Sequence, residues 1–593
     1  MLILEYNLIC ITINIEKEVC VLFDFSVIFD VGVVALRILM PIYAIFIVYQ
    51  CYAAMRRRRR SEKPLVTLVN TQTYEKTPVV FWENSIGRSK ANDITVNDPT
   101  VSRNHCVLLR RNEGWFVRDM NSTAGTYVNG EPAFERTRVL IDDVISVGNT
   151  KLQLLRGDEY YEEVQSSWFF KKVSNKPAIK AWKLMLMITL FHLFMGIEAM
   201  FWNDGTDVYA PIVLFGVLAA VEWGFFSISY FALRRVNFEL EALALFLTGI
   251  GVMLMVRQDL RSAYVQLIAA TIGMALFCVI IKLIENPDKL INKRLRMTVM
   301  AVAVGLLLAT ILYGMVFHTK YGAANWISIG PISFQPSEIV KVMYIFVGAS
   351  SLDVLQTKRN LIEFTVFSAI CVALLAVSSD FGTALIIFVT FLLIIFMRSG
   401  DILTVIVPTG AVVGGVFLIQ LVAPIIGFQE KIEYVFKRFK AYRHVWEYAQ
   451  DTGYQQVRVL TFVASGGLFG VGVGNGFLKQ YFASESDLVF GILAEEMGVI
   501  LAITLALAVA LLVIYGRAIA TRSRSTFYSI SACCAAGLLV VQLSLNVFGA
   551  TDVLPMTGVT FPFISYGGSS IISCWGLIAF IKAADERTYS LKR

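Results

Sequence analysis

The sequence predicts a polytopic α-helical membrane protein with an all-β domain inserted near its N-terminus, and composition and patterning carry this prediction. Of the 593 residues, 56% are hydrophobic and only 16% are charged, whereas soluble domains carry roughly 25% charged residues. The apolar residues gather in blocks of about 20, the length that crosses a hydrocarbon core roughly 30 Å thick. From Pro64 to Arg156 these blocks give way to short alternating segments between turn residues, which is typical of a small β sandwich.

The apolar blocks predict about thirteen membrane-spanning segments. We expect an N-terminal anchor at 27–52, the β domain at 64–157, extra segments within 183–233 and a membrane domain of about ten segments at 238–584. The first block has no small-residue cleavage site ahead of its arginine run, so it predicts an anchor rather than a cleaved signal. The predicted segments are 27–52, 183–202, 208–233, 238–256, 262–284, 295–317, 338–356, 360–378, 381–397, 401–424, 489–516, 527–550 and 566–584.

Basic residues predict the orientation of these segments. When the run Arg56–Arg60 is placed in the cytoplasm, the basic clusters at the other short loops also fall inside, as the positive-inside rule requires. The β domain is then cytoplasmic, and the loops that follow residues 317, 424 and 550 face outward. The long loop 425–488 mixes basic and aromatic residues and is predicted to lie on the membrane surface as an amphipathic segment.

The charge distribution argues against a nucleic-acid partner, and the spacing of cysteines and histidines argues against a structural metal site. Topology accounts for the net charge of +7, so we expect a membrane but no nucleic acid as a partner. The nine cysteines and four histidines show no metal-ligand spacing, and we expect no structural metal.

Three short motifs in the β domain can form a phosphate-binding rim. The motifs are Gly87-Arg88, then Ser102-Arg103-Asn104-His105, then the stretch Asn121 to Gly130. Arginine and serine side chains that converge from separate loops make a charge-assisted cradle for a phosphate dianion. Each motif alone is explained more simply by turn capping, but all three in this order and at this spacing favour a common rim.

These motifs resemble the forkhead-associated (FHA) domain over its whole length. The resemblance implies a module that binds a phosphothreonine-containing protein supplied by a Ser/Thr kinase pathway. The residues that it implies as phosphopeptide contacts are Arg88, Ser102, Arg103, Asn104 and Thr123. It also implies that His105 and Asn129 hold the loops, while Ala124 replaces an Asn that usually grips the peptide backbone.

Four patches in the membrane half are too polar or too rich in glycine for ordinary spanning helices, and polar groups at membrane depth are costly unless they face a cavity or a partner. The patches are Asn325–Lys341, Ser379–Thr383, Gly453–Gly498 and Leu554–Ser570. Taken singly, each is explained by helix caps, tight turns or close packing. The predicted topology instead gathers these loops at or near the outer face.

Two features of these patches suggest chemistry. The N–H groups of a glycine-rich loop can cradle an anion such as a pyrophosphate. Asp487 precedes a long apolar stretch, where a carboxylate can take a proton from an alcohol on a membrane-anchored substrate. Glu338 and Lys341 are three residues apart at a predicted helix start and can form an ion pair.

Together the patches resemble the SEDS family of cell-wall proteins (FtsW, RodA and SpoVE) from about Phe238 to Lys582, through FQPSE, DFGT and PFISYGGSS. The resemblance implies a peptidoglycan glycosyltransferase that polymerises lipid II at the outer leaflet. Asp487 would be the general base that deprotonates the acceptor 4-hydroxyl, and undecaprenyl pyrophosphate would leave with inversion. Asn325 replaces an Arg that is usual before the following Trp.

The same resemblance implies substrate contacts and partners. The candidate substrate-binding residues are Lys479, Asn475, Gly474, Glu338, Lys341, Gln335, Trp326, Asp380, Ser565, Ser569 and Ser570. No cofactor is required, although a divalent cation, Mg or Mn, is left open as a counter-ion for the pyrophosphate. A class B penicillin-binding transpeptidase is expected to crosslink the undecaprenyl-linked glycan in a bacterial cytoplasmic membrane, and a role in division, elongation or sporulation is left open.

Two other functions would use the same features. A lipid II flippase would use the same cavity but would not need an acid at the outer interface, so Asp487→Asn distinguishes it from a polymerase. A phospho-dependent scaffold of the cell-wall machinery would need only the β domain, and Arg88→Ala would then remove its effect.

Overall fold

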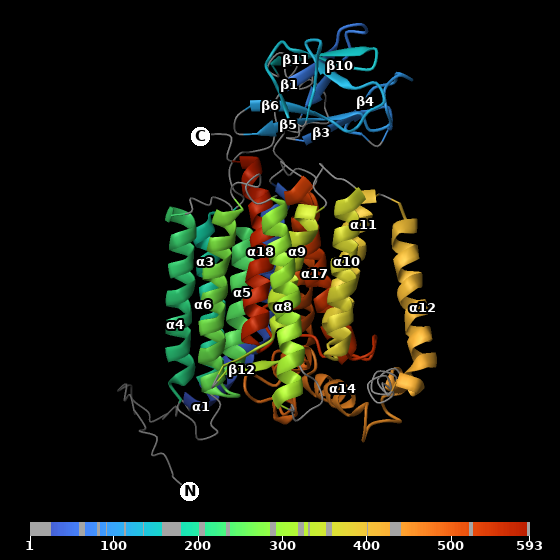
Figure 1. The fold of residues 1–593 in the computed structure, drawn as a ribbon. Helices are drawn as coiled ribbons and strands as arrows, with labels where there is room; N and C mark the ends of the chain where they lie inside the picture. Colours follow the sequence, from blue (N-terminus) through green and yellow to red (C-terminus); the bar gives the residue numbers. More distant parts are fainter. Residues whose placement is uncertain are drawn as a thin grey trace, which may run out of the picture.

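The computed structural model describes residues 25–57, 66–79, 83–90, 92–111, 114–134, 136–156, 179–200, 208–232, 238–284, 292–317, 325–329, 332–351, 358–399, 401–426, 440–520 and 526–589. Figure 1 shows a bundle of long helices with a β sandwich over one end, which we call the sandwich end. The strand β12 (Ile327–Ile329) and the helix α14 (Tyr454–Gly466) lie at the opposite end, which we call the far end. The predicted fold class, a polytopic helical membrane protein with an inserted all-β domain, is confirmed.

The sandwich consists of two sheets with the strand orders β2-β1-β11-β10-β7-β8 and β4-β3-β5-β6-β9. Side chains alternate between the faces of a strand, so in β10 Ile145 and Val147 are buried between the sheets. The strands are β1 (Val66–Asn70), β2 (Lys76–Val79), β3 (Glu83–Gly87), β4 (Ile94–Thr95), β5 (Cys106–Arg111), β6 (Gly114–Asp119), β7 (Thr126–Val128), β8 (Glu131–Pro132), β9 (Thr137–Val139), β10 (Val144–Val147) and β11 (Thr150–Arg156).

Thirteen long helices in the described part of the chain overlap the thirteen predicted segments. They are α1 (Phe25–Arg57), α3 (Ala181–Met200), α4 (Ala210–Ser227), α5 (Glu239–Met255), α6 (Leu260–Leu283), α8 (Lys293–Phe317), α9 (Pro336–Ser351), α10 (Lys358–Val377), α11 (Phe381–Ser399), α12 (Leu403–Ile426), α16 (Val499–Ala520), α17 (Thr526–Ala550) and α18 (Gly568–Tyr589). The shorter elements are the π-helical turn η1 (Ile228–Ala232), the strand β13 (Ile332–Phe334), the 3-10 turn η2 (Leu478–Gln480) and α15 (Val489–Glu496).

One segment differs from the prediction. The stretch 489–516, expected as one span, is divided into α15 and α16. The break lies at Gly498, whose φ of +89° is a left-handed conformation that glycine adopts at helix ends. As a result, α15 stays at the far end as a separate short helix, and only α16 crosses the bundle.

By length and apolar composition, eight helices among the described residues qualify as membrane spans. The helices also differ in burial, since some lie inside the bundle and others on its surface. The shorter α5 is buried on all sides, as expected for a helix that is apolar all round at the centre of a bundle. By contrast, α8 exposes Leu312, Met315 and Val316. We therefore treat the chain as a multi-pass membrane protein whose outer helices contact lipid.

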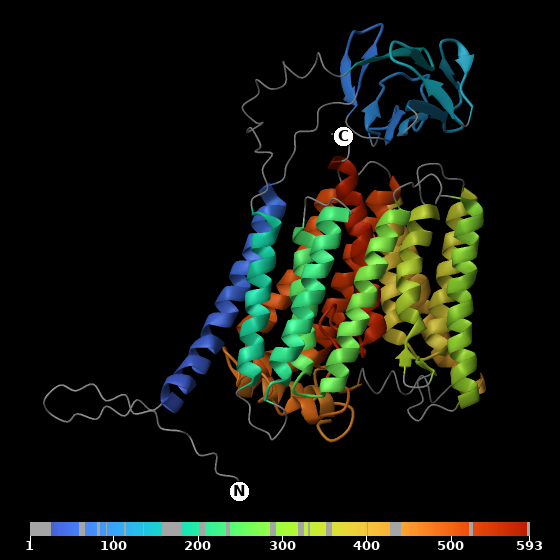
Figure 2. The same ribbon diagram turned by 90° about the vertical axis from the view of Figure 1, so that its left-hand side faces the viewer.

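The helices run alternately toward the two ends of the bundle (Figures 1 and 2). The hairpin of β12 and β13, the helix α14, and the segments 467–498 and 551–567 consequently lie together at the far end. Within the predicted amphipathic loop 425–488, residues 427–439 lie outside the described part of the chain.

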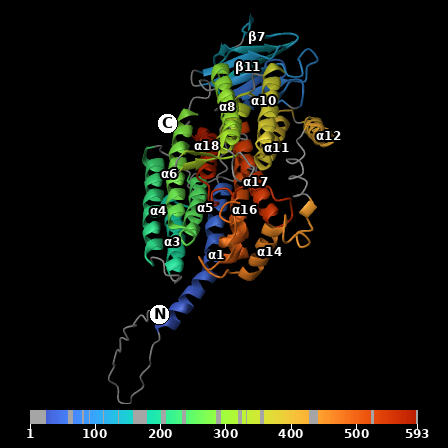
Figure 3. The same ribbon diagram turned by 60° about the horizontal axis from the view of Figure 1, so that its bottom comes forward.

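The helices α1, α3 and α4 pack on one side of the bundle, and Figure 3 shows α1 passing beside α16. His192 of α3 lies between α4 and α5. Its Nδ1 is 3.2 Å from Glu222 Oε1 of α4, and its Nε2 is 3.2 Å from the Phe246 carbonyl oxygen of α5. Gly249 is required here, because a Cβ at this position would collide with the imidazole ring.

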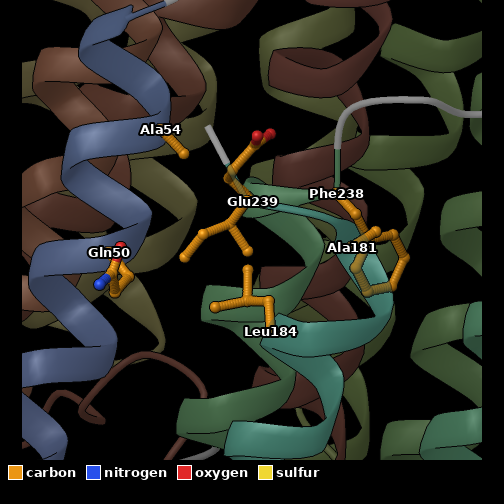
Figure 4. Close-up of a pocket in the computed structure, with 7 residues that line it drawn as sticks. Gln50, Ala54, Ala181, Leu184, Phe238 and Glu239 are labelled. Carbon is orange, nitrogen blue, oxygen red and sulfur yellow. The ribbon is translucent and has the colours of Figure 1, made fainter. Parts of the chain in front are cut away.

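Figure 4 shows a small cavity between α1, α3 and the start of α5. Its lining residues are Gln50, Ala54, Ile179, Ala181, Leu184, Phe238 and Glu239. Ala54 is near the C-terminal end of α1, so the cavity lies toward the sandwich end and includes none of the predicted site residues.

Glu83 connects the sandwich to the bundle. Glu83 Oε2 of β3 accepts hydrogen bonds from the N–H and the hydroxyl of Thr526, both at 2.8 Å. Thr526 is the first residue of α17, and a carboxylate at a helix N-terminus complements the helix dipole.

Candidate functional site at the far end of the bundle

Asp487 lies in a turn directly ahead of α15. Its backbone N–H donates to the Ala483 carbonyl at 3.0 Å, and its backbone carbonyl accepts a hydrogen bond from Asn546 Nδ2 at 3.0 Å. The side chain is partly exposed. Gly558, with a φ of +68°, leaves room for it, since a Cβ there would lie 3.2 Å from Asp487 Oδ2. The backbone is therefore held, and the residue keeps part of its surface exposed.

The loop between α17 and α18 holds the Asp487 turn from the other side. Ser565 Oγ donates to the Ser486 carbonyl at 2.5 Å and accepts from the Phe561 N–H at 2.8 Å. The Tyr566 N–H donates to the Glu485 carbonyl at 2.9 Å. The PFISYGGSS motif thus fixes the residues on the N-terminal side of Asp487.

Two amide side chains of α17, Gln542 and Asn546, connect this loop to the interior of the bundle. Asn546 Nδ2 donates to the Val559 carbonyl at 2.7 Å in addition to Asp487. Gln542 Nε2 donates to Thr560 Oγ1 at 2.9 Å, and its Oε1 accepts from Lys341 Nζ at 2.8 Å. These residues are one helical turn apart, so a single face of α17 serves both contacts.

The predicted ion pair of α9 is confirmed. Lys341 Nζ lies 2.8 Å from Glu338 Oε2, and the two side chains are 1% and 6% exposed. Ser573 Oγ of α18 donates to the same carboxylate oxygen at 2.6 Å. Because both charges are paired and hydrogen-bonded, the low dielectric of the interior strengthens the network instead of destabilising it.

The Asp380 carboxylate accepts hydrogen bonds from three residues. Its Oδ1 accepts from the Thr383 N–H at 3.1 Å, which caps the start of α11. Its Oδ2 accepts from Gln335 Nε2 and from Ser337 Oγ, both at 2.9 Å. Gln335 also donates its backbone N–H to Ser569 Oγ of α18 at 3.3 Å.

The glycine-rich loop of residues 466–476 is held by the two acids that end α15. The Glu495 carboxylate accepts from the N–H groups of Phe477 at 2.8 Å and Leu478 at 3.0 Å, and Glu496 Oε2 accepts from the Gly474 N–H at 2.9 Å. Within the loop the Gly474 N–H is therefore occupied by a carboxylate of the chain, and the role of the remaining N–H groups as an anion cradle stays a prediction.

The predicted substrate-binding residues fall into three groups. Gln335, Glu338, Lys341, Asp380, Ser569 and Ser570 belong to the interior network, where the Ser570 and Thr560 hydroxyls lie 2.7 Å apart, and Ser565 belongs to the Asp487 turn. Gly474 and Asn475 lie on the glycine-rich loop, and Lys479 lies just after it in η2. Lys479 Nζ donates to the Gly474 carbonyl, and Asn475 Nδ2 donates to the Val471 carbonyl at 3.0 Å. Trp326 stands apart, 42% exposed ahead of β12.

Sequence reasoning missed Gln542, Asn546 and the roles of Glu495 and Glu496. A signal for the first two was present, since amides four residues apart in an otherwise apolar span mark a polar face at membrane depth. The role of Glu496 had no local signal, because its partner Gly474 lies 22 residues away.

The burial of Glu496 makes the glycine-rich loop sensitive to pH. Desolvation raises the pKa of Glu496 from 4.5 to about 7, against the opposing effects of the Gly474 hydrogen bond and the Lys479 charge. A carboxyl group with a raised pKa binds a proton in the closed loop that it has lost in the open one. The free energy of loop opening is therefore expected to fall as the pH rises from 4.5 to about 7 and then to level off.

Hydrogen exchange of the 471–478 amides, corrected for intrinsic rates, measures this dependence. In Glu496→Gln the side chain cannot titrate, so the pH slope is expected to disappear. An unchanged slope in that variant would show that another group titrates.

In the sandwich, the predicted phosphopeptide-binding residues lie on loops that meet at one rim. The Arg88 N–H donates to the Ser102 carbonyl at 3.0 Å, and Ser102 Oγ accepts from the Thr123 N–H at 2.9 Å. The side chains of Arg103 and Asn104 are exposed beside them. The rim therefore presents two guanidinium groups and hydroxyls at neighbouring positions.

Buried His105 supports this rim. Its Nδ1 accepts from the Ser102 N–H at 3.1 Å, and its Nε2 lies 3.1 Å from the Gly125 carbonyl. Asn129 fixes the next loop, because its Nδ2 donates to Asp143 Oδ1 at 2.8 Å and its Oδ1 accepts from the Val144 N–H at 2.9 Å.

Two separate segments of the chain match known protein families. The FtsW/RodA/SpoVE family, described as "Cell cycle protein", matches residues 242–590, and the FHA domain matches residues 84–148. The probable peptidoglycan glycosyltransferase FtsW of Bacillus subtilis is 31% identical over 331 residues, which cover 53% of this chain and 79% of that protein. The peptidoglycan glycosyltransferase RodA of Mycobacterium leprae is 25% identical over 389 residues, 60% of this chain and 80% of that protein.

A solved structure described as "Structural coordination of polymerization and crosslinking by a peptidoglycan synthase complex" aligns with 59% of this chain and 98% of that chain, at 22% identity and a TM-score of 0.49. The matched segments contain the far-end network and the rim of the sandwich. The chain belongs to the FtsW/RodA/SpoVE family and carries an FHA domain ahead of the family's membrane domain.

Proposed function

We propose that this chain is a peptidoglycan glycosyltransferase that polymerises lipid II into glycan strands. The observation that carries the proposal is the setting of Asp487, a partly exposed carboxylate whose backbone is held by Asn546 and by the PFISYGGSS loop. A general base must be fixed in position yet open to its substrate. The names of its relatives, FtsW and RodA glycosyltransferases, support the same reaction.

In the proposed reaction, the Asp487 carboxylate accepts the proton of the acceptor sugar's 4-hydroxyl. The hydroxyl oxygen then forms a bond to C1 of the growing glycan, while the bond from C1 to the undecaprenyl pyrophosphate oxygen breaks on the opposite face with inversion. The proton held by Asp487 is released to water after each cycle.

A divalent cation as counter-ion for the pyrophosphate stays a prediction from the sequence. Glu495 and Glu496, the two acids beside the glycine-rich loop, accept hydrogen bonds from backbone N–H groups. We derive no step through Mg or Mn.

Charge at the helix ends supports a cytoplasmic sandwich and an extracytoplasmic Asp487. Lys293, Arg294 and Arg296 at the start of α8, Arg517 near the end of α16 and Lys582 in α18 all lie toward the sandwich end. Basic residues accumulate on the cytoplasmic side of membrane proteins. Lipid II would then be used at the outer leaflet, with its isoprenoid tail in the bilayer.

The proposed product is an uncrosslinked strand, so a separate class B penicillin-binding transpeptidase is the proposed partner. The related solved structure concerns a complex that couples polymerization to crosslinking. The lipid-facing outer helices leave room in the membrane for such a partner to approach.

The FHA domain is proposed to read a phosphothreonine on a cytoplasmic protein that a Ser/Thr kinase modifies. Arg88→Ala is expected to weaken binding of a phosphothreonine peptide by about tenfold or more, because a charge-assisted hydrogen bond to phosphate is lost. Isothermal titration of the purified chain with a phosphothreonine peptide library measures this effect.

Arg138→Ala is the matched control. Arg138 is exposed on β9 beside Gly114, at the end of the β5–β6 hairpin away from the rim. Equal losses in both variants would argue for non-specific attraction between the basic sandwich and the peptide.

Glycan synthesis from purified lipid II by the purified full-length chain tests the proposed function. The expected product is a ladder of glycan strands on a gel. A chain that moves lipid II between leaflets without extending it would support the flippase alternative instead.

A further inference from the structure

Two helices outside the family-matched segment contact the glycine-rich loop. Arg37 of α1 and Glu198 of α3 form an ion pair with a distance of 3.1 Å between Arg37 Nε and Glu198 Oε1. The family match begins only at residue 242, so neither residue belongs to the shared membrane domain. Glu198 is almost fully buried, with a side chain that is 4% exposed.

The Arg37–Glu198 ion pair contacts residues 472 and 473 of the glycine-rich loop. Gly472 has a φ of +105°, and a Cβ at this position would collide with the Arg37 guanidinium, so the guanidinium packs directly on the backbone. The Val473 backbone N–H lies near the Glu198 carboxylate, and the Val473 side chain is buried.

The same loop segment is also held by α15. The Val471 N–H donates to the Glu495 carbonyl at 2.9 Å, and the Gly472 N–H donates to the Glu496 carbonyl at 2.8 Å. Residues 471–474 therefore contact α1 and α3 through Arg37 and Glu198, and also contact α15. We call this set of contacts the clamp. Because α15 begins two residues after Asp487, displacement of the clamp would shift the start of α15 and the Asp487 turn.

The helix that supplies Arg37 also leads toward the FHA domain. Arg37 lies in the far-end half of α1, and the same helix ends at Arg57, nine residues before the first strand of the sandwich at Val66. Within α1, Tyr43 Oη donates to the Met187 carbonyl of α3 at 3.1 Å, which fixes the two helices against each other.

We propose that Arg37 and Glu198 are positioning residues for the glycosyltransferase site: they hold the glycine-rich loop, and through α15 the Asp487 turn, in the geometry for reaction. This proposal rests on the proposed function for its catalytic consequence, but the contact with the loop does not depend on that function. The helix that carries the phosphothreonine reader thereby supplies part of the support of the catalytic site.

The test compares Arg37→Met, Glu198→Gln and Arg37→Lys with the wild-type chain in two measurements. Hydrogen exchange of the 471–475 amides, measured without substrate, is expected to accelerate about tenfold in the first two variants, because local opening becomes easier. The turnover number for lipid II polymerisation is expected to fall by about tenfold or more with little change in KM, since misplacement of a catalytic group slows the chemical step. Arg37→Lys keeps the charge but loses the planar guanidinium, so intermediate values are expected.

Lys183→Met is the control, because it removes an exposed positive charge from the other end of α3. It is expected to change neither loop exchange nor turnover, and the midpoint of thermal unfolding identifies any variant that is globally destabilised. Unchanged exchange at 471–475 in Arg37→Met and Glu198→Gln would overturn the proposal that this ion pair holds the loop. Faster exchange with unchanged turnover would overturn its positioning role. If the wild-type chain makes no glycan, the proposed function fails while the exchange data still decide whether the pair holds the loop.

Discussion

Asp487→Asn is expected to lower the rate of glycan synthesis by about 10²–10⁴-fold, the usual contribution of a general base. The amide has nearly the same shape as the carboxylate but cannot accept the proton of the acceptor hydroxyl. The contacts that hold this turn use backbone atoms of Ala483, Ser486 and Asp487, so the fold of the turn is expected to persist. The measurement is the initial rate of strand formation from purified lipid II.

The control for this substitution is Asp451→Asn. Asp451 is an exposed carboxylate in the turn ahead of α14, also at the far end, and its replacement is expected to leave the rate unchanged. Lipid II movement between leaflets of the same vesicles separates the alternatives. A variant that loses movement together with synthesis would point to transport or folding rather than to proton transfer.

Lys341→Met is expected to lower the free energy of unfolding by about 3–5 kcal/mol, the typical effect of removing one partner of a buried ion pair. The substitution leaves the Glu338 carboxylate buried with only the Ser573 hydroxyl and without its cation. It also removes the hydrogen bond to Gln542 Oε1. Unfolding of the purified chain in mixed micelles measures the change.

The double variant Glu338→Gln/Lys341→Met distinguishes the unpaired charge from lost packing. Because the glutamine is neutral, most of the stability lost in Lys341→Met is expected to return. Lys440→Met, which replaces an exposed lysine at the far end, is expected to change stability by less than about 0.5 kcal/mol. A double variant as unstable as Lys341→Met would mean that Lys341 acts through its aliphatic packing.

The spanning helices and the sandwich were predictable because their patterns are local. Apolar blocks of membrane-crossing length and alternating strands reflect burial along a single element. The break at Gly498 was missed because the long apolar runs on either side of it predicted one span, although Glu495 and Glu496 interrupt the apolar pattern just ahead of the glycine. The Glu338–Lys341 pair was predictable for the same local reason, since residues three apart share one face of a helix.

The connections that make a site from these elements were not predictable from local patterns. Lys341 and Gln542 are 201 residues apart, and Asn546 and Asp487 are 59 residues apart. Arg37 and Glu198 are 161 residues apart. Their pairing depends on how the helices pack, which no local spacing encodes. Only the resemblance of the four polar patches to one family predicted that these distant patches belong to a common site.

We propose that proton transfer takes place outside the cell while the FHA domain faces the cytoplasm. Labelling of single cysteines with a membrane-impermeant maleimide tests it most directly, in a chain whose native cysteines are replaced. Phe482→Cys reports on the Asp487 turn, because Phe482 is 72% exposed beside it, and Asn104→Cys reports on the exposed rim of the FHA domain. In intact protoplasts, we predict labelling at position 482 and none at position 104 until the membrane is permeabilised. Labelling at position 104 but not at position 482 would contradict this orientation.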